Sequence, residues 1–303
     1  MTRRPMFALV FLAATFLAVL LLSAGLSQPV FAGLIGEYPF DEGTANDISG
    51  NGNNGTNHGA TFVSPGYRAG DPGAFMFTSF ASVTLPTTID PTPSVLPQIT
   101  FGGWFNPASA STVSGLISSD NGGFDRTIGI DGRGSGGLYT WSAFTGSGVV
   151  SSGVVPTLNA WTFVAVAYNQ ATNSGDLYVG RVGVDLTTSG THFTTAFDAD
   201  TVGFLDIAIN PTFTNEIFTG MIDDAFVNDS FLTQAQINSI FQNGLPGLAP
   251  SAVPEPGSLA LVGVAALQIG FFALRRRKRV VPASAASDRP PEQSPADSFG
   301  GSR

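Results

Sequence analysis

Oxygen-bearing side chains alternate in a Gly- and Asn-rich stretch, "DISGNGN" (47–53). Asp47, Ser49 and Asn51 are spaced like the first ligands of a calcium-binding EF-hand loop. The twelfth position of such a loop would be His58 instead of a bidentate Glu, so the stretch is not an EF-hand. Calcium binding would therefore need a carboxylate from another strand. The alternative is a tight Asn/Gly turn capped by the Asp47 side chain.

A second group of side chains has the chemistry of a sugar site. Such sites combine aromatic rings that stack on pyranose faces with polar groups that bind hydroxyls. Tyr139 and Trp141 stand two residues apart in "GGLYTWSAF", and the preceding Gly-rich segment carries Arg126, Asp131 and Arg133. These five residues form the candidate glycan site. The alternative is that Tyr139 and Trp141 belong to the core.

The composition excludes several other chemistries. The chain has no cysteine and only two histidines, which excludes disulfides, thiolate nucleophiles and histidine-rich metal sites. Residues 33–256 contain four arginines, no lysine and 19 acidic residues. A surface of that sign repels phosphate backbones, so nucleic acid is not an expected partner, and it attracts divalent cations.

The elements that position these residues are mostly β-strands. Between residue 33 and about 227, apolar residues occur in short runs separated by turn residues and not at helical spacing. The segment 161–169 alternates between two mostly apolar faces, which predicts a strand covered on both sides. The segment 176–184 should form a hairpin with it, and further strands are expected at 201–210 and 218–228. This pattern favours a β-sandwich or jelly roll.

One helix is predicted at the end of this domain, in "FLTQAQINSIFQNG" (231–244). Thr233 can cap its start, and Gln236 three residues later completes a capping box. Leu232 before the cap and Ile237 at the fourth helical position can form a hydrophobic staple. We expect this short helix to pack against the sandwich.

The first 32 residues are typical of a secretory signal peptide. Arg3 and Arg4 precede a long apolar stretch, and small residues favour cleavage after Ala32. The alternative is an uncleaved membrane anchor. In either case the chain after residue 33 is exported.

A second apolar segment, residues 257–274, lies near the C-terminus. Its 18 residues, at about 1.5 Å each, just cross a hydrocarbon layer of about 30 Å. The basic cluster after it should hold the C-terminal side in the cytoplasm. Residues 245–256 read as a Pro-rich linker, and residues 280–303 as a disordered tail. The flanking residues that define the segment are Pro254, Glu255, Pro256, Arg275, Arg276 and Arg277.

The order of motifs between residues 33 and 244 resembles laminin G-like, concanavalin A-type jelly-roll domains. The resemblance rests on five ordered segments, which are 33–63, "ITFGGWFNP" (99–107), "NAWTFVAVAYN" (159–169), "GDLYVGRV" (175–182) and 218–244. It implies an all-β, concanavalin A-like jelly-roll sandwich with one short C-terminal helix. In this family an acidic segment equivalent to that of Asp223 lies near the 47–53 turn, which implies Asp223 as the carboxylate that completes the calcium site.

Jelly rolls of this type include both lectins and glycosidases, so the fold does not decide between them. The β-glucanases of the fold carry a Glu-x-Asp-x-x-Glu strand, and Glu37, Glu42 and Glu216 do not lie in such a pattern. The adjacent Asp223 and Asp224 are expected to point to opposite faces of a strand. We therefore expect no enzymatic activity.

The C-terminal pattern, Pro-Glu-Pro, apolar run and basic cluster, resembles the PEP-CTERM sorting signal of Gram-negative bacteria. In that family an exosortase-type enzyme is thought to process the signal, and many carriers belong to the cell surface. The alternative is an ordinary single-span anchor. Both interpretations divide the chain into five segments, namely 1–32, 33–244, 245–256, 257–279 and 280–303.

We expect an exported, surface-sorted, lectin-like module that binds polysaccharide or a surface protein. The alternatives are a structural or adhesive matrix protein, or a glycoside hydrolase.

Overall fold

The computed structural model describes residues 33–181, 186, 190–196 and 201–245, which lie within one compact unit. Several predicted segments lie outside the described residues, namely the signal peptide, the apolar run 257–274, the tail and all of the linker except Leu245. Among the residues that are described, no helix has both the length and the apolar character needed to cross a membrane.

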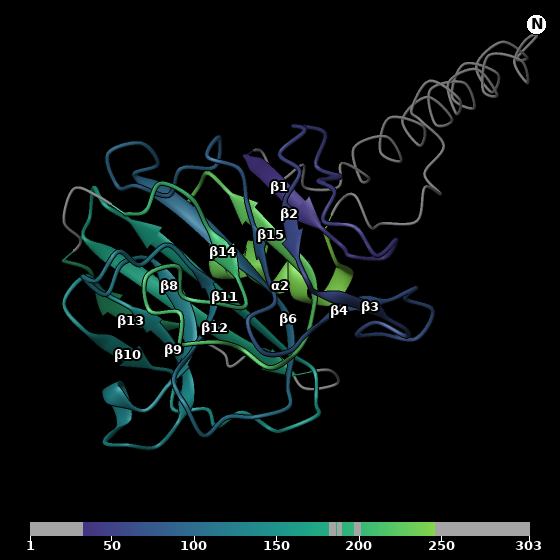
Figure 1. The fold of residues 1–303 in the computed structure, drawn as a ribbon. Helices are drawn as coiled ribbons and strands as arrows, with labels where there is room; N and C mark the ends of the chain where they lie inside the picture. Colours follow the sequence, from purple (N-terminus) through teal and green to yellow (C-terminus); the bar gives the residue numbers. More distant parts are fainter. Residues whose placement is uncertain (1–32, 182–185, 187–189, 197–200, 246–303) are drawn as a thin grey trace, which may run out of the picture. The chain divides into compact units, whose positions relative to one another are not determined.

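Two antiparallel sheets lie face to face (Figure 1). The first has the order β13 (Thr191–Thr194), β12 (Ser174–Arg181), β11 (Thr162–Asn169), β6 (Gln98–Pro107), β15 (Gly220–Asn228), β4 (Ala74–Phe77), β3 (Thr61–Val63), with β1 (Leu34–Tyr38) paired to β15. The second has the order β10 (Val149–Ser151), β9 (Thr140–Phe144), β8 (Thr127–Asp131), β7 (Ser114–Ser118), β14 (Asp206–Ile207), β5 (Ser82–Thr84), β2 (Thr56–His58). The predicted all-β jelly-roll sandwich is confirmed.

Strand β11 separates two apolar layers, as its alternating sequence predicts. Val164, Val166 and Tyr168 are buried in the main core between the sheets. Phe163 and Ala165 point the other way, into a second buried cluster on the outer face of the first sheet. The hairpin with β12 is also confirmed, because the two strands pair along their whole length.

Helix α2 (Gln234–Asn243) covers that second cluster. Thr233 caps it, and Thr233 and Gln236 form the complete capping box. Leu232 and Ile237 are both buried in the cluster beneath the helix. The predicted helix and its packing are therefore confirmed, and the local capping signals explain why it begins where it does.

The predicted strand 201–210 is much shorter than expected. Only Asp206 and Ile207 form a strand, β14, between β5 and β7, and Ile209 makes an isolated antiparallel bridge with Ile217. Gly203 and Ala208 have φ values of +76° and +73°, in the left-handed region, which ends the extended conformation on both sides. A strand of only two residues therefore connects β5 and β7 within the second sheet.

Candidate functional site

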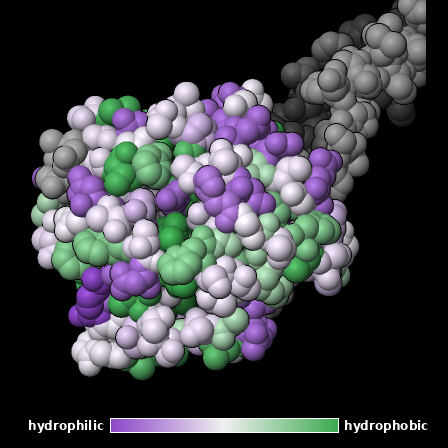
Figure 2. Space-filling view, viewed as in Figure 1, coloured by the Kyte–Doolittle hydropathy of each residue, from purple (hydrophilic) through white to green (hydrophobic). Residues whose placement is uncertain are grey.

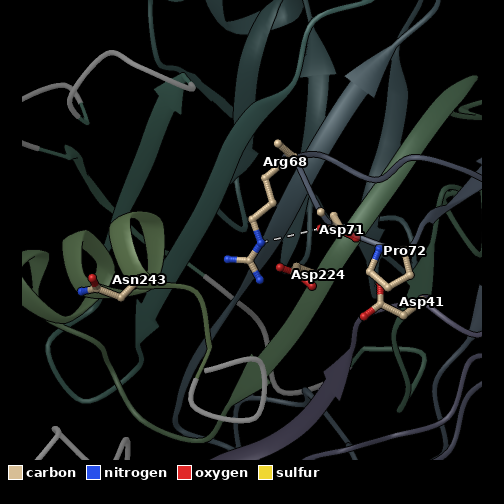
Figure 3. Close-up of a pocket in the computed structure, with 8 residues that line it drawn as sticks. Asp41, Arg68, Asp71, Pro72, Asp224 and Asn243 are labelled. Atoms are coloured by element: carbon tan, nitrogen blue, oxygen red, sulfur yellow. Dashed lines mark ion pairs between the residues drawn. The ribbon is translucent and has the colours of Figure 1, made fainter. Parts of the chain in front are cut away.

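An acidic pocket lies on the first sheet, where the turn after β1, the β3–β4 loop and β15 meet (Figure 3). One carboxylate oxygen from each of Asp41, Asp71 and Asp223 lies within 4.8 Å of the others. Asp224 adjoins them, and we call these four residues the aspartate pocket. The cavity has a volume of about 340 Å³ and is lined by Asp41, Arg68, Ala69, Gly70, Asp71, Pro72, Asp224 and Asn243.

A β-bulge brings the two adjacent aspartates of β15 into this one site. The pairing of β15 with β6 shifts register between Asp223 and Phe226, and Asp224 has a φ of +46°. Asp223 is fully buried beneath the cavity, while Asp224 lines it. The prediction that the two side chains point to opposite faces is therefore wrong, because strand alternation fails at a bulge.

Backbone groups hold the deepest carboxylate in place. Asp223 accepts hydrogen bonds from the backbone N–H of Tyr67 at 2.9 Å and from that of Asp224 at 2.9 Å. The ring of Tyr67 stacks on Trp104 with centroids 4.3 Å apart, which ties the loop to the second apolar cluster. The Asp223 carboxylate therefore has a fixed position at the bottom of the site.

The other carboxylates of the pocket are only partly satisfied. Asp71 Oδ1 accepts a hydrogen bond from the backbone N–H of Gly73 at 3.3 Å, and the Tyr67 side chain forms a hydrogen bond with Asp224. The buried Oδ1 of Asp41 and Oδ2 of Asp224 make no hydrogen bond in the part of the chain that the structure describes. The nearest cation, Arg68, is 40% exposed, and its Nε lies 3.9 Å from Asp71 Oδ2 (Figure 3). A half-exposed ion pair at that distance compensates little of the buried charge.

The pKa values of three of these carboxyls are raised. Burial and the neighbouring Asp41 raise the pKa of Asp71 to about 6. Burial, together with repulsion from Asp224 and Asp71, raises the pKa of Asp223 to about 9. Burial and repulsion from Asp71 raise the pKa of Asp224 to about 8. At neutral pH the site therefore retains protons unless a cation replaces them.

This donor set fits a hard divalent cation. Such ions take several oxygen ligands, and the aspartate pocket offers four carboxylates. Two of the carboxylate oxygens are buried without a partner, which costs free energy unless a proton or a metal ion satisfies them.

The 47–53 turn lies apart from this cluster. Asp47 accepts backbone hydrogen bonds from Glu37 at 3.0 Å, Ser49 at 2.8 Å and Asn53 at 2.9 Å. The Asn51 amide donates to the Ser49 hydroxyl at 3.0 Å. The turn thus has the Asx-capped form, and its oxygens are already used. Of the predicted calcium ligands Asp47, Ser49, Asn51 and Asp223, only Asp223 belongs to the aspartate pocket.

A second cavity, of about 310 Å³, lies beside the 3₁₀ helix η1 (Arg133–Ser135). We call it the Arg133 pocket; its lining residues are Val113, Gly132, Arg133, Gly137 and Tyr139. Two of the five predicted glycan residues, Arg133 and Tyr139, therefore line one cavity. Tyr139 is half-buried, with part of its side chain against the main core.

The other three predicted glycan residues are fully buried. Trp141 lies in the main core, because the alternation of β9 turns it towards the first sheet. Arg126 donates from Nη1 to the carbonyl oxygens of Pro91 and Leu96 at 2.7 and 2.5 Å, so it fixes a loop. Asp131 is 0% exposed and pairs with Arg133. None of the three side chains has surface for a sugar to contact, which corrects the predicted glycan set.

A polar network that the sequence did not indicate surrounds Arg133. Its Nη2 lies 2.6 Å from Asp131 Oδ2 and 3.2 Å from Glu216 Oε1. Asn210 Nδ2 donates to Glu216 Oε2 at 3.0 Å and to Asp120 Oδ2 at 2.9 Å. One guanidinium and one amide therefore link three carboxylates, Asp131 at the end of β8 and Asp120 and Glu216 from two separate loops.

Sequence comparison identifies the family. Residues 77–238, just over half of the chain, match the family model described as the concanavalin A-like lectin/glucanases superfamily, so the chain belongs to that superfamily. Residues 252–278 match the PEP-CTERM protein-sorting motif, which indicates an exported protein sorted to the cell envelope. No curated protein matches the chain significantly.

One solved structure supports the same fold. It is domain 4 of AbnA, a GH43 extracellular arabinanase from Geobacillus stearothermophilus, solved in complex with arabinotriose. The two chains share 17% identity with a TM-score of 0.52, and the match covers 69% of this chain and 98% of that one. At this identity the likeness shows the fold alone. The botulinum neurotoxin serotype G binding domain has 13% identity and a TM-score of 0.48, covering 69% of this chain and 50% of that one, and no conclusion is drawn from it.

Proposed function

We propose that the exported domain is a non-catalytic module that binds polysaccharide outside the cell, and that a calcium ion in the aspartate pocket stabilises it. The Arg133 pocket is the observation that supports polysaccharide binding, because it combines a half-buried tyrosine ring with a half-exposed guanidinium. Sugar recognition requires that pairing of an aromatic face with a hydrogen-bond donor. Family membership and the sorting motif support an exported binding module.

Calcium is the ion that best suits the aspartate pocket. It takes six to eight oxygen ligands in flexible geometry, whereas magnesium demands a near-ideal octahedron and keeps several waters. Asp41, Asp71, Asp223 and Asp224 would hold it. When bound, the ion supplies the positive charge that these carboxylates lack. The chain's own residues fix the site, since Asp223 is anchored by backbone N–H groups and Asp41 and Asp71 come from the loops beside it.

The carboxylate geometry supports a non-catalytic role. Retaining glycosidases place two carboxyl groups about 5 to 5.5 Å apart on either side of the scissile bond. Beside the Arg133 pocket, Asp131 and Glu216 both contact the same guanidinium nitrogen, so both carboxylates are held in ion pairs. In the aspartate pocket, the oxygens of Asp41, Asp71 and Asp223 converge on one point, as they would around an ion.

One face of the domain favours a hydrated polymer over a protein matrix as the partner. On the face shown in Figure 2, hydrophobic residues are interspersed with hydrophilic ones. Permanent protein interfaces are usually larger and more apolar than such a surface offers.

The sorting motif suggests how the module reaches the surface. In this proposal, residues 257–274 insert in the inner membrane with the C-terminus in the cytoplasm, and an exosortase-type enzyme recognises Pro254, Glu255 and Pro256. Fractionation of the source cells would recover the protein in the envelope or outside the cell. Recovery from the cytoplasm alone would contradict this route.

Substitution Tyr139→Ala tests the binding function. Removing the ring should weaken binding to the source cell's exopolysaccharide about tenfold, which corresponds to about 1.4 kcal/mol. Affinity electrophoresis of the purified protein measures the change. Phe80→Ala is the matched control, because Phe80 is 67% exposed beside β5, four strands from β9 in the second sheet. Equal binding by wild type and Tyr139→Ala would exclude this pocket.

A further inference from the structure

The charge balance of the Arg133 pocket indicates which sugars it takes. We propose that the pocket binds an uncharged sugar unit and discriminates against sugars that carry a carboxylate or sulfate. The inference rests on the proposed polysaccharide-binding function and deepens it by naming the ligand class. It is based on the ion pairs of Arg133 and on the N–H groups of that side chain that are left to bind a ligand.

The positive charge of Arg133 is already neutralised. Its Nε donates to both oxygens of Asp131, at 3.1 and 2.8 Å, and its Nη2 donates to Asp131 Oδ2 at 2.6 Å. Glu216 Oε1 lies 3.2 Å from the same Nη2. Bidentate pairs of this kind are strong and geometrically specific. With two carboxylates on one guanidinium, the cluster carries a net negative charge.

For an anionic ligand, the guanidinium of Arg133 is therefore already paired with two carboxylates. The ligand could accept from Nη1 only as a third carboxylate on one guanidinium, where Asp131 and Glu216 would repel it, or it would have to displace one of them. Asp131 is 0% exposed, and displacement would leave it buried without its partner, which is costly. The surrounding domain adds to the effect, since residues 33–256 hold four arginines against 19 acidic residues and repel polyanions at long range.

The pocket still offers what a neutral sugar needs. The Arg133 side chain is 42% exposed, and its Nη1 makes no hydrogen bond within the described part of the chain. Those N–H groups can donate to sugar hydroxyls without any change of ion pairing. The rings of Phe124 and Phe144 lie 5.2 and 5.3 Å from the guanidinium carbon and hold it in a fixed position.

Apart from Arg133, the residues that line the pocket are uncharged, and two of them are glycines. Gly137 has a φ of +100°, which favours glycine, and a Cβ atom placed there would meet no atom within 4 Å. No side chain from Gly132 or Gly137 narrows the cavity beside Tyr139. A volume of about 310 Å³ lies at the lower end of the range for small-molecule sites, roughly 300 to 1,000 Å³, which suits a short stretch of a glycan chain.

Matched pairs of polymers test this inference. The purified full-length protein is titrated, in calcium-containing buffer, with a soluble β-1,3-glucan, β-1,4-mannan and β-1,4-galactan. Each is also used after oxidation of its primary alcohols to carboxylates. We expect at least one neutral polymer to bind and its oxidised form to bind at least tenfold more weakly. Binding of the neutral form should change less than twofold between 50 and 500 mM salt, because no net ion pair forms.

The variant Glu216→Gln should gain binding of the oxidised polymers. It removes one of the two carboxylates that neutralise Arg133, so the affinity for the oxidised form relative to that for the neutral form should rise at least fivefold. Asp229→Asn is the control, because it removes the same charge from an exposed turn elsewhere. It should change neither affinity.

The outcomes separate the inference from the function on which it rests. If wild type binds the oxidised polymers as tightly as the neutral ones, or more tightly, and Tyr139→Ala abolishes that binding, the sugar class is wrong and the binding function stands. If wild type binds no polymer of either form, the proposed function itself is overturned. If neutral binding is lost in Tyr139→Ala and kept in Phe80→Ala, both are supported.

Discussion

Adding calcium to cation-free protein should raise its melting temperature by about 5 to 10 °C. A ligand at a hundred times its Kd stabilises the folded state by about 2.7 kcal/mol, and a domain of this size gains about 2 to 4 °C per kcal/mol. The physical source is the aspartate pocket, where the ion would satisfy the buried oxygens of Asp41 and Asp224 that have no hydrogen-bond partner. Differential scanning fluorimetry with and without chelator measures the shift.

The variant Asp224→Asn assigns this shift to the pocket. Asparagine keeps the shape of the side chain and tolerates the left-handed φ of +46° at this position, so the bulge should persist. The calcium-induced rise should fall to less than half. Asp229→Asn, which removes an equal charge from an exposed turn, should keep the full rise. A rise that is equal in Asp224→Asn and in wild type would place the ion elsewhere.

Without calcium, the protein should lose stability as pH rises from about 4 to about 9. Folding raises the pKa of Asp71, Asp223 and Asp224 from an ordinary value near 4 to about 6, 9 and 8. The native state therefore binds more protons than the unfolded state throughout this window. Each such proton lowers the free energy of unfolding by about 1.4 kcal/mol per pH unit, until the pH passes the folded pKa of its group.

Calcium should oppose this loss. Metal binding requires deprotonated carboxylates, so the stabilisation by calcium should grow as pH rises, and the pH dependence should flatten. Urea unfolding between pH 4.5 and 8.5, with calcium and with chelator, measures both slopes. Stability that increases with pH in the chelator series would contradict the raised pKa values. Asp224→Asn should be less sensitive to pH than wild type in chelator.

The parts of the fold that the sequence predicted are those with local signals. The alternation in 161–169 specifies a strand with two apolar faces, and β11 has them. Thr233 and Gln236 specify a helix start within four residues, and α2 begins there. The strand 201–210 was overestimated, because a left-handed Ala208 cannot be inferred from an apolar run.

The aspartate pocket depended on contacts that no local pattern contains. Asp41 and Asp71 are 30 residues apart and Asp223 lies on the last strand, so only the sheet pairing brings them together. The bulge that turns Asp224 towards them has no signature in "MIDDAF". The acidic turn "FDEG" follows β1 closely and so places Asp41 at a sheet end, but its sequence alone does not mark Asp41 as a ligand.

Two of the five residues predicted for a glycan site line the Arg133 pocket, and the difference within the pair Tyr139 and Trp141 has a similar reason. Tyr139 and Trp141 have the spacing of one strand face, and both do lie towards the core side. Tyr139 precedes the first residue of β9 and reaches the cavity, whereas Trp141 lies inside the strand and is fully buried. Whether a residue lies at the end or the middle of a strand decided its exposure, and strand ends are the least predictable feature of a sequence.

Calorimetric titration of the protein with the source cell's exopolysaccharide tests the central claim most directly. In calcium, we predict saturable binding; in chelator, binding should weaken as far as loss of the ion unfolds the domain, because the two pockets share no lining residue. Asp224→Asn in calcium should resemble wild type in chelator. The absence of heat or saturation in calcium, with a protein shown by circular dichroism to be folded, would contradict the account and leave a structural role in the envelope.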